Sequence, residues 1–235
     1  MQDLRSIMVG LSVAFAAGWA MPAGAQGLSM PDGCEVYATV QNRDCTVMQL
    51  YTCEADPDGY QQSMTFGPDG LEFVSVIDSE AQWIRSFSPF SGAIDELDSD
   101  NADPASFTEL LETGEDTYDF TQTSPQLGTR RYTGVDQLTG RKVTIDGVEL
   151  EETAYRMRTY DAEGNEVYRA EGHEFISRDW RRFFAGTGTL TTPQDTFDED
   201  GRPANFAFPG EAGFMSTNPE YGCGAILSRA SVHRN

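Results

Sequence analysis

The chain has 235 residues, of which 39% are hydrophobic and 23% charged, and its formal net charge at pH 7 is -22. This length supplies enough apolar surface for one well-packed domain and is short for two. The acidic excess argues against nucleic acid as a partner, because binding to phosphates requires a net basic face. An anionic membrane surface would also repel most of the molecule.

The first 25 residues predict a signal peptide. The run from Ile7 to Met21 contains only glycine, serine and small or apolar residues, and Ala23-Gly24-Ala25 supplies small residues where signal peptidase cleaves. The run is shorter than the roughly 20 residues that span a bilayer as a helix. We expect cleavage before Gln26, one β-rich domain over residues 26–235, and a periplasmic or secreted protein without a transmembrane segment. An uncleaved anchor is the alternative, because the residues before the run are only weakly basic.

Four cysteines in an exported chain favour two disulfides over a metal site, since no Cys-x-x-Cys pair occurs. Two strands joined by a two-residue turn at Arg43-Asp44 would place Cys34 directly opposite Cys53. Cys45 and Cys53 would then lie about 27 Å apart on one extended strand and could not pair. We predict the bonds Cys34–Cys53 and Cys45–Cys223. A shift of the turn by one residue would exchange the partners.

Apolar and β-branched runs recur about every eight to twelve residues, with turn pairs such as Asp58-Gly59 between them, which is typical of consecutive β-strands. We predict a mainly β fold: a single antiparallel meander, half-barrel or barrel of about ten strands with one short helix and two disulfides. The expected strands lie near residues 36–41, 46–52, 61–66, 71–77, 82–87, 116–123, 129–136, 142–145, 149–160, 166–176 and 187–192.

One helix is expected after Asp103-Pro104, which supplies an N-cap followed by proline at the first helical position. Phe107 and Leu110 then recur at helical spacing, and Gly114 would end the helix. The stretch from 194 to 213 is rich in proline and glycine and is expected to be a long loop.

The common enzyme motifs do not occur in the sequence. There is no Gly-x-Ser-x-Gly, no Ser-x-x-Lys, no phosphate-binding glycine loop and no His-Glu-x-x-His. His173 is the one histidine on a predicted strand, and a hydrogen bond to a neighbouring carboxylate is its simplest role. A glycosidase needs two carboxylates about 5 to 10 Å apart, and a chain with 38 acidic residues can form such pairs by chance.

Calcium is the one metal ion for which candidate ligands can be named. Asp195, Asp198 and Asp200 precede Gly201 and form part of a calcium-loop pattern. The pattern is incomplete, because Thr196 stands where the first aspartate belongs. Solvated acidic turns are the simpler interpretation, and no other cofactor is expected.

Large side chains on the predicted strands pair up by alternation, so that the members of each pair share a face. These faces are expected to point inward, where a half-closed barrel either fills its interior or leaves room for an apolar ligand. The candidate ligand-binding residues are Trp83 with Phe87, Tyr118 with Phe120, and Tyr155 with Met157, together with Trp180 from the arginine-rich segment 177–184.

The leading functional hypothesis is a non-enzymatic protein that binds an apolar or amphiphilic molecule, or an envelope partner protein, in the concavity of its sheet. The alternatives are a secreted hydrolase with paired carboxylates and a calcium-stabilised structural protein. One region differs from the rest in charge, because residues 130–182 hold ten basic and eleven acidic side chains, a local balance of -1. If a partner binds through charge, we expect it to bind this near-neutral region rather than the acidic remainder.

Overall fold

The computed structural model describes residues 28–224, and the predicted signal peptide lies outside this range. Thirteen strands form one antiparallel sheet that does not close. One short helix, α1 (Phe107–Thr113), lies between the sixth and seventh strands in the chain. The strands are β1 (Cys34–Asn42), β2 (Val47–Cys53), β3 (Gln61–Gly67), β4 (Gly70–Ile77), β5 (Trp83–Ser88), β6 (Ala93–Leu97), β7 (Glu115–Ser124), β8 (Gly128–Ile145), β9 (Val148–Tyr160), β10 (Glu166–Ser177), β11 (Arg182–Thr191), β12 (Thr196–Asp200) and β13 (Pro203–Ala207). Within residues 28–224, no helix is both long and apolar enough to cross a membrane.

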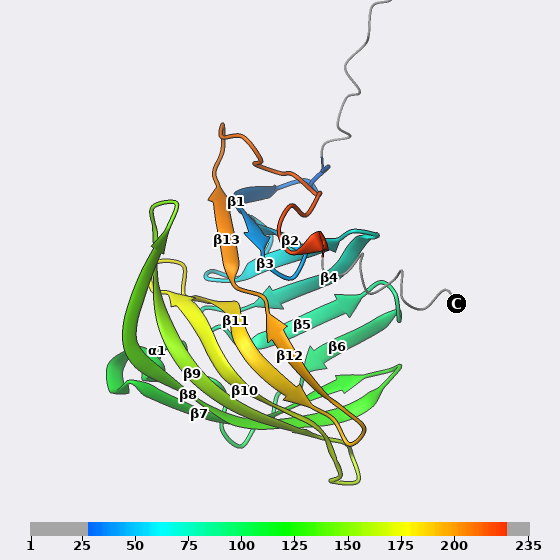
Figure 1. The fold of residues 1–235 in the computed structure, drawn as a ribbon. Helices are drawn as coiled ribbons and strands as arrows, with labels where there is room; N and C mark the ends of the chain where they lie inside the picture. Colours follow the sequence, from blue (N-terminus) through cyan, green and yellow to red (C-terminus); the bar gives the residue numbers. More distant parts are fainter. Residues whose placement is uncertain (1–27, 225–235) are drawn as a thin grey trace, which may run out of the picture.

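The sheet is a meander from β1 to β12, with one exception at its end. Each of these strands pairs with the next along the chain, whereas β13 pairs with β1. Only Gly201 and Arg202 separate β12 from β13, so a single interrupted stretch of chain forms both edges of the sheet. Figure 1 shows the resulting roll, with β10–β12 in front and β3–β6 behind.

The expectation of a long loop at 194–213 is wrong, because β12 and β13 lie within it. All five residues of β12 are exposed, and four of them are polar. The strand therefore lacks the apolar alternation that identifies a half-buried strand. It exists because β11 presents a free edge to which its backbone pairs. Pro203 begins β13, a position where proline costs no ladder hydrogen bond.

Three further boundaries differ from the expectation. Residues 129–136 and 142–145 belong to one strand, β8, and Thr139-Gly140 forms a bulge in it rather than a turn between strands. Strand β11 begins at Arg182 rather than near residue 187, so it includes the end of the arginine-rich segment 177–184. The short β6 at Ala93–Leu97 was not expected, since five residues give too few alternations to detect.

The N-cap of helix α1 lies three residues later than the predicted cap, Asp103. Ser106 is the N-cap, and its hydroxyl accepts a hydrogen bond from the Glu109 backbone N–H at 3.1 Å. Gly114 ends the helix as expected, in the left-handed conformation with φ of 86°. Glu80, in the β4–β5 loop, accepts hydrogen bonds from the Thr108 backbone N–H and from Arg181 of the β10–β11 turn, both at 2.8 Å. The helix is thereby fixed to two loops at one end of the sheet.

Both predicted disulfides form, Cys34 with Cys53 and Cys45 with Cys223. The turn between β1 and β2 has three residues rather than two, and Cys45 is in the turn with φ of 64°. A bulge between Val36 and Ala38 then adds one residue to β1. The two one-residue offsets cancel, so Cys34 still lies opposite Cys53.

The Cys45–Cys223 bond holds the last described segment against the first hairpin. Gln41 donates to the Asn218 carbonyl and Gln49 to the Ser216 carbonyl, at 3.0 and 2.6 Å. Both glutamines are buried, so this segment satisfies polar groups that would otherwise lack partners.

Removing the Cys45–Cys223 bond should destabilise the protein more than removing Cys34–Cys53. The two bonds close loops of 178 and 19 residues, and the chain-entropy model assigns them roughly 5 and roughly 3 kcal/mol. Urea unfolding of the two Cys-to-Ala double variants measures the difference. An equal loss in both variants, or the reverse order, would contradict the loop-closure explanation.

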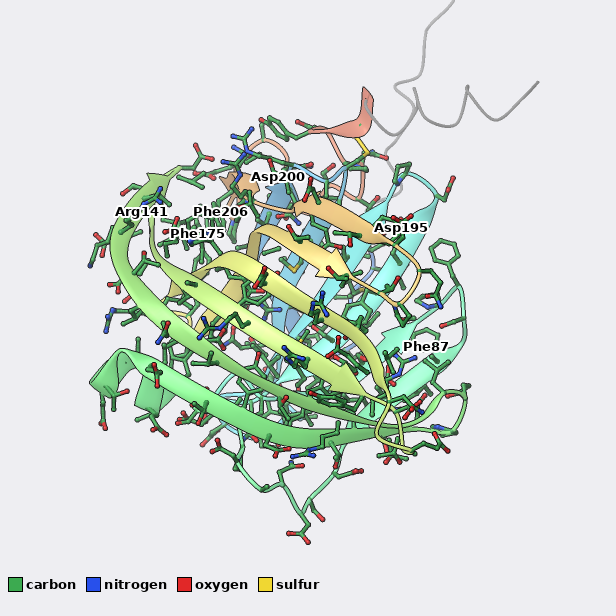
Figure 2. All side chains as sticks on the ribbon, turned by 60° about the horizontal axis from the view of Figure 1, so that its bottom comes forward. Phe87, Arg141, Phe175, Asp195, Asp200 and Phe206 are labelled. Atoms are coloured by element: carbon green, nitrogen blue, oxygen red, sulfur yellow. A yellow bond between two sulfur atoms is a disulfide. The ribbon has the colours of Figure 1, made fainter. Side chains whose placement is uncertain are left out.

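At the end of the sheet near the β8–β9 and β10–β11 turns, β9 and β10 are buried on both faces. Leu150 and Phe175 pack with Ala38, Leu50 and Phe206 of β1, β2 and β13. Figure 2 shows Phe175 and Phe206 side by side in this cluster. On the other face, Ile176 packs against Phe107 and Leu110 of the helix. The roll of the sheet and the single helix together build this closed end.

Away from this closed end, the sheet bends so that one of its faces is concave. Trp83 on β5 and Tyr132 on β8 are three strands apart, which is about 14 Å on a flat sheet. Their ring centroids are only 5.7 Å apart. The face that carries these two rings is therefore concave.

Two tyrosine rings on the concave face lie across glycines of other strands, one strand away for Tyr118 and two strands away for Tyr155. Tyr118 lies opposite Gly134 in the β7–β8 register, and a Cβ at Gly134 would overlap its phenol. The Tyr155 hydroxyl lies over Gly188 of β11 in the same way. Because glycine has no Cβ, each tyrosine ring can lie directly on the backbone of the strand that contains the glycine. A larger side chain at either glycine would occupy the same space as the ring.

The substitution Gly134→Ala should lower the free energy of unfolding by about 1–3 kcal/mol, since its Cβ would overlap both the buried Tyr118 ring and the Arg156 backbone carbonyl, which cannot move aside freely. Gly188→Ala should cost less, because it meets mainly the hydroxyl end of the half-buried Tyr155. Chemical denaturation of both variants tests the order. Full stability of Gly134→Ala would show that the Tyr118 ring does not need this space.

Candidate functional site

A cluster of aromatic side chains lies on the concave face. Phe120 stacks on Tyr132 with ring centroids 5.1 Å apart, and Trp83 meets both rings edge-on at 5.7 Å. Tyr118 lies beside Phe120 at 5.7 Å. Leu97, Met157 and Tyr168 pack around these rings, so strands β5 to β10 all contribute.

Part of this concave face is open. Trp83 is 45% exposed, although its ring packs on the buried Phe120 and Tyr132. Phe73 is on the same face as Ile77 by alternation along β4, and Ile77 lies opposite Trp83.

Phe197 of β12 lies opposite Leu190 of β11, in a row that continues across β10, β9 and β8 to Tyr118. It therefore also points to the concave face. Phe73 and Phe197 are 40% and 47% exposed. Three of the most exposed aromatic side chains of the described chain thus point to one side of a curved sheet.

The expectation that Phe87 shares the face of Trp83 is wrong. Phe87 lies opposite Val74 and Ile94, and its neighbour Ser86 lies opposite Ser75 on the concave side. A bulge in β5 at Ile84 changes the alternation between Trp83 and Phe87. Phe87 is therefore on the convex face, where it is 37% exposed.

The other candidates fall into two groups. Tyr118, Phe120, Tyr155 and Met157 lie on the concave face as expected, with Met157 touching the aromatic cluster. Trp180 lies apart from them in the β10–β11 turn, where it packs on Tyr37, Phe184, Phe206 and Phe208. It lines a separate hollow of about 510 Å³ whose other walls include Tyr60, Asp56 and Asp179.

Three carboxyl groups on the concave face were not singled out from the sequence. Asp116 of β7 lies directly opposite Asp136 of β8, and Asp136 lies directly opposite Tyr155 of β9. Glu174 of β10 is two positions from Gly172, the next residue in that row. We name Asp116, Asp136 and Glu174 the carboxyl row. Asp116 alternates with Tyr118 and Phe120 along β7, and this pattern was the signal that could have indicated it.

The carboxyl row lies between the helix and the aromatic cluster. Asp116 is 3% exposed and Asp136 is 9% exposed, while Glu174 is half-buried. One oxygen of Asp116 accepts a hydrogen bond from the Ser106 backbone N–H at 3.0 Å, and its other oxygen has no partner among the described residues. No Arg, Lys or His of the described chain forms an ion pair with any of the three.

The environment of the carboxyl row favours the protonated forms. Burial raises the pKa of Asp116 to about 6, and the negative charges of Glu109, Asp103 and Glu80 act in the same direction. The hydrogen bond from the Ser106 backbone lowers this pKa but does not offset the rise. Burial and the nearby Asp116 raise the pKa of Asp136 to about 7. Burial and Asp136 raise the pKa of Glu174 to about 8. These values exceed the ordinary range of carboxyl groups.

The proposed calcium ligands do not converge. Asp200 is paired with Arg202, Asp198 accepts from Thr189, and Asp195 accepts from the Thr196 backbone. Within residues 28–224, no three His, Cys, Asp or Glu side chains lie close enough to hold a metal ion. The geometry therefore gives no support to a calcium site there.

The near-neutral region 130–182 carries a groove on the convex face. It has a volume of about 310 Å³ and is lined by Arg156, Arg158, Arg169 and threonines of β8 and β11. Glu166 bonds both Arg158 and Arg169, at 2.8 and 3.2 Å. The groove is thus partly neutralised and lies on the opposite side of the sheet from the aromatic cluster.

Comparison of the chain with protein-family models, with curated proteins and with solved structures found no match. The function is therefore inferred from the geometry of the concave face.

Stability should fall as the pH rises from about 5 to about 8.5. The folded pKa values of the carboxyl row, about 6, 7 and 8, exceed the unfolded values near 4, so the folded state holds more protons in this window. The stabilisation is complete below about pH 4 and is lost as each group ionises in the folded protein. Urea midpoints measured across this range test the slope.

The double variant Asp136→Asn with Glu174→Gln should reduce that slope, because its side chains cannot ionise. Glu171→Gln, on the convex side of β10, is the control and should keep it. A wild-type stability that rises over the same window would show that the carboxyl row ionises freely in the folded state.

Proposed function

We propose that this protein is an exported, non-enzymatic binding protein that holds an apolar or amphiphilic molecule against the concave face of its sheet. The observation that supports this is the exposure of Phe73, Trp83 and Phe197 on that face. Large apolar side chains gathered on a concave surface are the usual lining of a ligand site. The two disulfides support export, because such bonds persist in oxidising compartments.

The aromatic cluster gives the site a rigid wall. Phe120, Tyr132 and Tyr118 are buried and fixed by each other, so Trp83 rests on a preformed surface. A ligand that covers the exposed part of Trp83 would gain roughly 25 cal/mol for each Å² of apolar surface removed from water. Little ordering of the protein would be needed, which favours binding.

A hydrolase with paired carboxylates is the second candidate. One observation favours it: Asp116 and Asp136 lie directly opposite each other on one face of the sheet. Cβ atoms of such a pair are about 5 Å apart. Asp116, however, is covered by the segment before the helix and is 3% exposed. A substrate could not reach both carboxyl groups of this pair, and we therefore favour binding without catalysis.

The variant Trp83→Ala should weaken binding of the apolar fluorophore N-phenyl-1-naphthylamine by about tenfold, since one indole supplies much of the exposed apolar surface. Phe87→Ala is the matched control: its ring is similarly exposed but lies on the convex face. Fluorescence titration gives the dissociation constants, and thermal melting checks that both variants are folded.

Equal weakening in Trp83→Ala and Phe87→Ala would contradict the concave site. Native mass spectrometry of protein purified from its own source provides an independent measurement. We expect an additional bound mass that is lost in Trp83→Ala.

A further inference from the structure

We propose that the ligand of the concave face is a cationic amphiphile, whose apolar chain covers the aromatic cluster and whose amine is held by Asp136 and Glu174 of the carboxyl row. This inference rests on the proposed function and names the chemical class of its ligand. It follows from the position of Asp116, Asp136 and Glu174 on the same face as Trp83, and from the lack of any basic partner for them.

The apolar and acidic parts of the face are continuous. Asp136 lies beside Tyr155, and Met157, two residues further along β9, packs on the aromatic cluster. Glu174 and Tyr155 are half-buried, so a head group that reached past the rings would meet them first. Asp116 lies behind Asp136, away from solvent.

Polar atoms in this region lack partners, which indicates that the site is built for another group. The Thr153 side chain is 0% exposed, its hydroxyl has no hydrogen-bond partner among the described residues, and it lies directly opposite Glu174. The second oxygen of Asp116 is also unpartnered. Buried polar groups are rarely left without hydrogen bonds, and an ammonium group brings up to three donors.

The charge around the row fits a cation and no anion. The groups whose charges act on Asp116 are Glu109 of the helix, Asp103 before it and Glu80 of the β4–β5 loop. Asp136 is influenced by Asp116, and Glu174 by Asp136. Tyr118 of β7 and Tyr155 of β9 face the row as neutral phenols, and Glu199 of β12 acts on Tyr155.

Arg181 of the β10–β11 turn is paired with Glu80. All the groups whose charges act on the three carboxyls are acids. An amine would relieve the repulsion among them, whereas a carboxylate or phosphate head group would increase it.

Binding of the amine should be linked to proton release. The row holds protons near neutral pH, and a bound ammonium favours the ionised carboxylates, so affinity should rise from about pH 5.5 to about pH 8. The amine itself stays charged over this range, because alkylammonium groups resemble lysine in pKa. A neutral ligand of the same chain length should show no such dependence.

The test compares dodecylamine, dodecan-1-ol and dodecanoate in calorimetric titrations of the full chain. At about pH 8 we expect dodecylamine to bind at least about tenfold more tightly than dodecan-1-ol, with dodecanoate weakest. At about pH 5.5 the preference for the amine should shrink to about threefold or less. Titrations in buffers of different ionisation enthalpy should show proton release for the amine alone.

Variants locate the head group. Asp136→Asn with Glu174→Gln should abolish the preference for dodecylamine and leave the affinity for dodecan-1-ol unchanged. Glu171→Gln on the convex side of β10, and Asp56→Asn with Asp179→Asn in the hollow at Trp180, should keep the preference. Loss of the preference in the Asp56 and Asp179 variant would place the amine in that hollow and overturn the proposal.

The outcomes separate this inference from the proposed function. If dodecan-1-ol or dodecanoate binds as tightly as dodecylamine at about pH 8, the concave face binds amphiphiles but the cationic class is wrong. If none of the three probes binds, the proposed function fails as well.

Discussion

A single sheet of thirteen strands has two faces to cover, and residues 28–224 contain one seven-residue helix with which to cover them. The sheet therefore has to bury itself, and it does so by rolling until β1, β2 and β13 pack against β9 and β10. Burial of apolar side chains on β-strands demands such a second layer. The break at Gly201-Arg202, which turns one edge strand into the other, makes this possible.

The roll buries one end of the sheet and leaves the other end partly open. At the closed end, helix α1 lies against Ile176 and the first strands lie against Phe175, so neighbouring residues of β10 are buried on opposite faces. At the other end no helix of the described residues covers the concave face, and its rings cover one another only in part. The exposed surface of Trp83 and Phe197 is a consequence of this asymmetry.

The same geometry concentrates acidic groups. Asp116, Asp136 and Glu174 come from three different strands and face one side of the sheet, close to the helix. In a chain with 38 acidic and 16 Lys and Arg residues, few cations remain to neutralise them. The cost of ionising them in place raises their pKa values and gives the concave face its chemical character.

The first hairpin shows how a correct result can depend on compensating details. The predicted bond between Cys34 and Cys53 assumed a two-residue turn, and the turn has three residues. The bulge near Tyr37 restores the pairing. In β5 a bulge at Ile84 has no such compensation, and it separates Trp83 from Phe87. Bulges depend on neighbouring strands as much as on local sequence, which is why alternation alone does not locate them.

The sequence by itself determined the strand-rich class, the short helix up to Gly114, the use of the four cysteines in disulfides and the shared face of Tyr118 with Phe120. These features depend on residues that are near in the chain or on the chemistry of one residue type. Only the tertiary structure decided that β12 and β13 are strands, that Trp180 lies apart from the other aromatic candidates, and that Asp116, Asp136 and Glu174 share one face of the sheet. Those outcomes depend on which distant strands share an edge or a face, and local periodicity carries no record of such pairing.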